Sequence, residues 1–161
     1  SHLIGQNFYF EDVLPAEAVR LNTIHTGTFS EILTYKVTYL TNLSSRYRVL
    51  ADSLSTQVDN QISCAVPGLA ANEYITAIRF EFGTVQEGFE SQSNPVLEVS
   101  VLPELFDGQR IQNTVTVSGE CDGVPIYDRS RWVTVVVDQP KQGRRALPKT
   151  GVWEEESRRK F

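Results

Sequence analysis

The fold of this chain is decided by residues 33–40, Leu-Thr-Tyr-Lys-Val-Thr-Tyr-Leu, in which apolar and polar side chains alternate. Leu33, Tyr35, Val37 and Tyr39 occupy every second position, with threonines and a lysine between them. Successive side chains of a β-strand point to opposite faces, so this spacing puts the four on one side. Aromatic and β-branched side chains also favour extended backbone. The segment predicts a strand with one buried face.

Similar runs follow along the chain, at residues 74–82, 96–101, 111–117 and 132–137, with weaker ones at 8–10, 18–24 and 46–50. Turn-forming pairs such as Pro67-Gly68 and Asp122-Gly123 separate them. About seven or eight short strands with turns at this spacing favour an all-β, antiparallel β-sandwich. We assign Tyr35, Phe80, Phe82 and Trp132 to its core. Residues 65–73 are expected to form a loop or one helical turn.

Composition limits the classes of function. The chain has 161 residues, of which 40% are hydrophobic and 22% charged, as in ordinary soluble domains. Its net charge of −5, with no basic stripe in the body, argues against a nucleic-acid partner. No signal peptide is visible, so an export signal would have to lie upstream.

A boundary is expected near residue 138. Residues 139–146 are polar, basic and rich in proline and glycine, a composition typical of a linker. We therefore predict one β-sandwich domain over residues 1–138 and a flexible tail over residues 139–161.

The tail contains Leu147-Pro148-Lys149-Thr150-Gly151, which resembles the LPxTG sorting signal of Gram-positive wall-anchored proteins. The resemblance implies recognition through Leu147 and Pro148, tolerance at Lys149, and sortase attack on the Thr150 carbonyl with Gly151 as the leaving amine. Pro148 fixes its own φ and biases Leu147 toward extended backbone. Gly151 has no Cβ and allows close approach. A peptidoglycan precursor would then be the covalent acceptor.

One feature departs from that signal. A membrane-spanning stretch of about 20 apolar residues normally follows it, before a basic end. Here Val152 and Trp153 are followed at once by residues 154–160, all charged except Ser157, so the basic end is present and the span is missing. We expect no membrane span in this chain.

The body itself resembles the DUF11-type surface repeat of wall-anchored Firmicutes proteins. The matching segments are residues 34–42, which end in Thr-Asn, residues 80–89 with a G-x-V-x-x-G turn, and residues 113–119 with an NT-x-T-V-x-G strand. They occur in the same order as in that family and cover roughly residues 16–138. The resemblance implies an immunoglobulin-like module, last before the wall, with no catalytic residue.

No enzyme or metal motif supports another assignment. The sequence contains no GxSxG, no HExxH and no glycine-rich phosphate loop. His2 and His25 lie far apart, so a zinc site built from them and the cysteines has no supporting spacing. Asp52, Asp59 and Asp107 lie near turns and could bind a calcium ion, but turns attract aspartate in any case. We expect a non-catalytic protein without cofactor or metal.

Two crosslinks are conceivable. Cys64 and Cys121 could form a disulfide in an exported protein, worth about 4 kcal/mol by the chain-entropy estimate, or remain two buried thiols. Lys36 and Asn113 could form an isopeptide bond, as many wall-anchored sandwich domains do. Lys36 shares its face with two threonines, which suggests solvent, so we predict no such bond.

The sequence thus predicts an extracellular, cell-wall-anchored stalk or spacer whose partners are sortase and peptidoglycan. Two alternatives stay open. One is an adhesin that binds a host protein or glycan through the loops at one end of the sandwich. The other is an accessory domain of a secreted carbohydrate-active enzyme.

Overall fold

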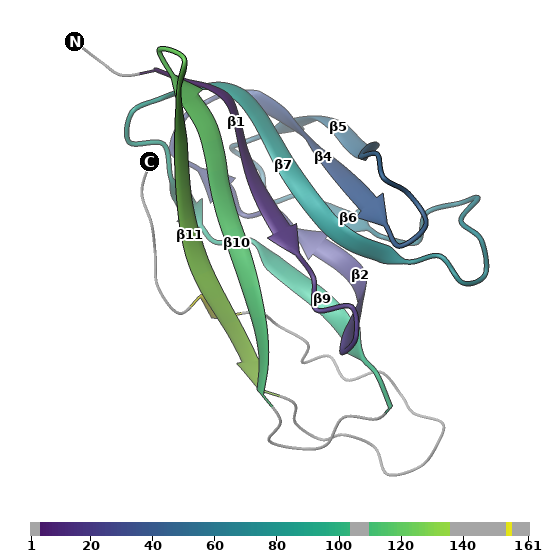
Figure 1. The fold of residues 1–161 in the computed structure, drawn as a ribbon. Coiled ribbons are helices and arrows are strands. Elements are labelled where there is room, and N and C mark those ends of the chain that lie inside the picture. Colours follow the sequence, from purple (N-terminus) through teal and green to yellow (C-terminus); the bar gives the residue numbers. More distant parts are fainter. Residues whose placement is uncertain (1–3, 104–109, 136–153, 156–161) are drawn as a thin grey trace.

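The computed structural model describes residues 4–103, 110–135 and 154–155 (Figure 1). Every regular element in these ranges is a β-strand, and all pairings are antiparallel, which confirms the all-β prediction. The large sheet has the order β12 (Glu154–Glu155), β11 (Val124–Val135), β10 (Arg110–Cys121), β1 (Ile4–Val13), β7 (Ile75–Gln86), β4 (Thr34–Thr41), β5 (Arg48–Ser55). A second sheet has the order β6 (Gln61–Ser63), β2 (Val19–His25), β9 (Val96–Val101), and β3 (Thr28–Phe29) pairs with β8 (Ser91–Ser93).

The small sheet packs against one face of the large sheet, which makes the molecule a two-layer sandwich (Figure 1). Buried apolar side chains from both layers meet between them in a single cluster. The large sheet contributes Phe8, Val37 and Ile78, and the small sheet contributes Val19, Ile24, Leu97 and Val99, all almost fully buried.

Strand β4 follows the predicted alternation. Tyr35, Val37 and Tyr39 are buried, and Lys36 is half-buried on the opposite face. Thr38 is also buried, and its hydroxyl is satisfied because it donates to Glu81 Oε2 on β7 at 2.6 Å. Phe80 and Phe82 are core residues as predicted, whereas the side chain of Trp132 lies outside the described part of the chain. Residues 65–73 form a loop with turns.

Strand β1 is the main departure from the sequence prediction, which rated residues 8–10 as a weak run and began the family resemblance near residue 16. It lies in the middle of the large sheet, hydrogen-bonded to β10 on one side and β7 on the other. Asn7 has a positive φ of 51°, and the pairing register shifts there. This irregularity interrupts the period-two pattern, so the strand is hard to recognise from sequence.

The start of β1 and the end of β11 lie at opposite ends of the sandwich. The start of β1 pairs beside the end of β10, with Gln6 opposite Glu120. β10 and β11 form a hairpin whose tight turn, Asp122-Gly123, has positive φ at both residues, as a type I′ turn requires. β11 then returns the whole length of β10, so that Val135 pairs with Arg110.

Strand β12 falls inside the segment predicted to be a flexible tail. Glu154 pairs with Val133 and Glu155 with Trp132, so these two residues form a short strand beside β11. No helix in the described ranges is long and apolar enough to cross a membrane.

Candidate functional site

The proposed sorting residues, Leu147 to Gly151, lie outside the described residues. Their role stays a prediction from sequence.

The possible disulfide is not formed. Both cysteines lie in the described part of the chain, and no bond joins them. Cys64 follows β6 in the small sheet, where its amide donates to the Asn22 carbonyl at 2.9 Å, whereas Cys121 ends β10 in the large sheet, opposite Val124. The pairing of each strand thus fixes the two thiols in different layers. Burial raises the pKa of the Cys64 thiol to about 12, which makes this thiol a poor nucleophile.

Lys36 and Asn113 are not neighbours. Lys36 lies on β4 and Asn113 on β10, with β7 and β1 between these strands. Three strand spacings separate them by about 14 Å. Asn113 is buried between the sheets, while Lys36 points away from that interior. The arrangement offers no route to an isopeptide bond between these two residues.

The acidic and histidine candidates have local structural roles. Asp52 Oδ1 accepts a hydrogen bond from the Ser53 amide at 2.7 Å, and Asp59 Oδ1 accepts one from the Gly27 amide at 2.9 Å. His25 bonds to Glu98 across β2 and β9. Within the described ranges no three His, Cys, Asp or Glu side chains gather as metal ligands. His2 and Asp107 lie outside those ranges.

A cluster around Arg79, the Arg79 cluster, lies on the outer face of the large sheet. The Arg79 guanidinium lies 4.3 Å from the Tyr9 ring and 4.0 Å from the Tyr47 ring, and its Nε donates to Glu11 Oε1 at 2.6 Å. The Tyr47 hydroxyl donates to the same oxygen at 2.9 Å. Burial and the Glu11 carboxylate raise the pKa of Tyr47 to about 12. The cluster ties β1, β7 and the segment before β5 together.

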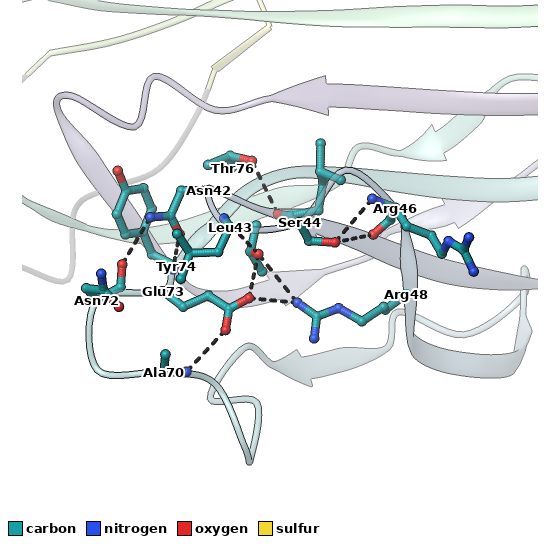
Figure 2. A network of polar contacts seen from close by, with 12 residues as sticks. Asn42, Leu43, Ser44, Arg46, Arg48, Ala70, Asn72, Glu73, Tyr74 and Thr76 are labelled. Carbon is teal, nitrogen blue, oxygen red and sulfur yellow. Dashed lines mark hydrogen bonds and ion pairs between the residues drawn. The ribbon is translucent and has the colours of Figure 1, made fainter.

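A second polar network joins the β4–β5 turn to the loop before β7 (Figure 2). Glu73 Oε2 accepts hydrogen bonds from Thr41 at 2.6 Å and Arg48 at 2.9 Å, while Oε1 accepts one from the Ala70 amide at 3.1 Å. These bonds, that of Thr41 foremost, lower the pKa of Glu73. Asn42 Oδ1 accepts from the Tyr74 amide at 2.8 Å. The network fixes two loops at one end of the sandwich.

The most unusual site is the acid–amide pair, Asp12 on β1 and Asn113 on β10. Asp12 is 9% exposed and Asn113 2% exposed, and Asn113 Nδ2 donates to Asp12 Oδ2 at 2.8 Å. The remaining oxygens, Asp12 Oδ1 and Asn113 Oδ1, are buried without a hydrogen-bond partner in the described structure. Burial, aided by the charge of Glu11, raises the pKa of Asp12 to about 7 despite the Asn113 hydrogen bond.

The sequence analysis missed this pair, although a signal existed. Asp12 continues the alternation of Phe8 and Phe10, and Asn113 precedes Val115 and Val117 with the same spacing. Period-two spacing therefore places both polar residues on the buried faces of their strands.

Comparisons with protein-family models, curated proteins and solved structures gave no match.

Proposed function

We propose that this chain is the wall-proximal, non-catalytic module of a Gram-positive surface protein, an immunoglobulin-like stalk or spacer anchored by sortase at residues 147–151. The observation that carries the proposal is the Leu147-Pro148-Lys149-Thr150-Gly151 sequence, placed after the last long strand of the sandwich. A sortase thiolate would attack the Thr150 carbonyl carbon, and the peptide bond would break as Gly151 leaves with a proton on its amine. An amine of the peptidoglycan precursor would then displace the sortase thiolate from Thr150.

The strand arrangement supports a role in carrying tension. A force that pulls the start of β1 away from the end of β11 acts along the strands, because these points lie at opposite ends of the sandwich. The hydrogen bonds between β1 and β10, from Gln6–Glu120 to Val13–Thr114, would then be loaded together in shear. A domain placed between an outer segment and the wall needs this property.

Sortase transpeptidation tests the anchor. We expect a class A sortase with triglycine to release residues 151–161 and to join the glycine nucleophile to Thr150, as read by intact mass. Thr150→Trp should abolish the reaction, because a bulky side chain obstructs the acyl position, whereas the matched variant Lys149→Ala should react like the wild type. If the protein stays uncleaved while a free peptide with the same five residues reacts, the anchoring proposal fails.

A further inference from the structure

We infer that Asp12 and Asn113 form a cyclic, two-hydrogen-bond pair that holds a proton, and that this pair makes the junction between β1 and β10 loosen as the pH rises. The inference does not depend on sortase attachment, since it concerns only the interior of the sandwich.

The positions of the unsatisfied atoms point to the proton. One hydrogen bond already joins the two groups, from Asn113 Nδ2 to Asp12 Oδ2. The atoms left over are one oxygen on each side chain, Asp12 Oδ1 and Asn113 Oδ1. Two acceptors cannot bond to each other, but a carboxylic acid carries an O–H donor. A proton on Asp12 Oδ1, donated toward Asn113 Oδ1, would satisfy both oxygens at once and close a ring of two hydrogen bonds.

The surroundings favour the neutral form of the acid. Asp12 lies opposite Val115 on β10 and Ile78 on β7, and the small sheet beneath supplies buried aliphatic side chains. An ionised carboxylate there would keep a single hydrogen bond in a site without water contact, which costs more than burying the neutral acid.

The charged side chains of the neighbouring strands engage other partners. On β1 and β7, Glu11 binds Arg79 and Glu81 accepts from Thr38, all on the outer face. On the remaining strands, Glu120 accepts from Asn7, Arg20 bonds to the carbonyls of Ala16 and Val19, and His25 bonds to Glu98. Of the described groups, Glu11 is the one whose charge acts on Asp12, and it favours protonation. No described cation faces Asp12 to stabilise its ionised form.

The direction of the pH effect follows from linkage. The pKa of Asp12 rises from 3.8 to about 7 on folding, so between these values the folded protein holds a proton that the unfolded chain has lost. The contribution of the pair is complete below pH 3.8, decreases as the pH rises, and levels off above about 7. Between the two values, the folding equilibrium constant should decrease by up to about tenfold per pH unit.

The experiment compares equilibrium unfolding of the wild type, Asp12→Asn and Asp52→Asn between pH 4.5 and 8.5. A carboxamide at position 12 can make both hydrogen bonds at every pH, because it brings its own N–H donor. We expect Asp12→Asn to lose the pH slope assigned to the pair and to be at least about tenfold more stable than the wild type at pH 8, in folding constant. Asp52→Asn removes an exposed carboxylate and should keep the slope of the wild type.

A second measurement uses the wild type alone. The carboxyl carbon of Asp12, followed by carbon-13 NMR, should titrate near neutral pH rather than near 4. A midpoint below pH 5, or an Asp12→Asn variant that keeps the slope of the wild type, would overturn the inference.

Discussion

Two stretches of β1 face the same interior with opposite chemistry. Phe8 and Phe10 enter an aromatic cluster with Phe29, Phe82 and Phe89, in which ring centroids lie 4.8 to 6.3 Å apart. Only two residues further along, Asp12 meets Asn113. The aromatic end is stabilised by apolar burial, which does not depend on protons. The acid–amide end depends on one proton, so a single strand combines a constant contribution to stability with a pH-dependent one.

The largest expected effect tests the aromatic end. Phe82 lies at the centre of the cluster, 4.9 Å from the Phe29 ring and 4.8 Å from the Phe89 ring. Phe82→Ala should lower the free energy of unfolding by about 3 to 5 kcal/mol, by the same amount at pH 5 and pH 8. Urea unfolding at both pH values measures it. Val124→Ala, at an exposed position, is the matched control and should change stability by less than about 0.5 kcal/mol.

If the loss of unfolding free energy in Phe82→Ala depends strongly on pH, the contrast between the two ends of β1 is wrong. The aromatic and acid–amide ends would then act as one unit. A loss below about 1 kcal/mol would also contradict it, since a well-packed core site should cost more.

A smaller effect is expected on the outer face of the same strand. Arg79→Leu removes the ion pair with Glu11 and the contacts with the Tyr9 and Tyr47 rings. The Arg79 and Glu11 side chains are 29% and 22% exposed, so solvent screening keeps the expected loss near 1 kcal/mol. Unfolding in 0.1 M and 1 M salt should show a smaller loss at high salt. Arg46→Leu, at an exposed turn position, should lack this salt dependence, and a salt-independent Arg79→Leu loss would argue against an ionic tie.

The sequence predicts the strands of the sandwich better than their arrangement. Tyr35, Val37 and Tyr39 are buried as their spacing requires, because period-two alternation is a local property. The sequence indicates strand β1 only weakly, because its regular run is short and Asn7 interrupts it. What stabilises β1 is pairing with segments about seventy and a hundred residues away, which local patterns do not encode.

The sites show the same limit. The acid–amide pair joins residues 101 positions apart, and the Arg79 cluster joins three segments that are separate in sequence. Alternation could place Asp12 and Asn113 on buried faces, but it could not bring them together. The reverse holds for residues 147–151, whose resemblance to a sorting signal can be seen without knowledge of the fold.

The proposed role as a tension-bearing module can be measured directly, because the start of β1 is one of the two points that the force would pull, and β1 contains both the aromatic and the acid–amide contacts. In single-molecule pulling, handles placed before Ile4 and after Val135 load the β1–β10 hydrogen bonds together. Handles placed before Ile4 and at Gly123 in the hairpin turn both lie at one end of the sandwich. Pulling on them breaks the same hydrogen bonds one after another. At equal loading rate, the first geometry should unfold at clearly higher force than the second. Equal unfolding forces in the two geometries, or a lower force in the first, would contradict the proposal that this sandwich carries tension.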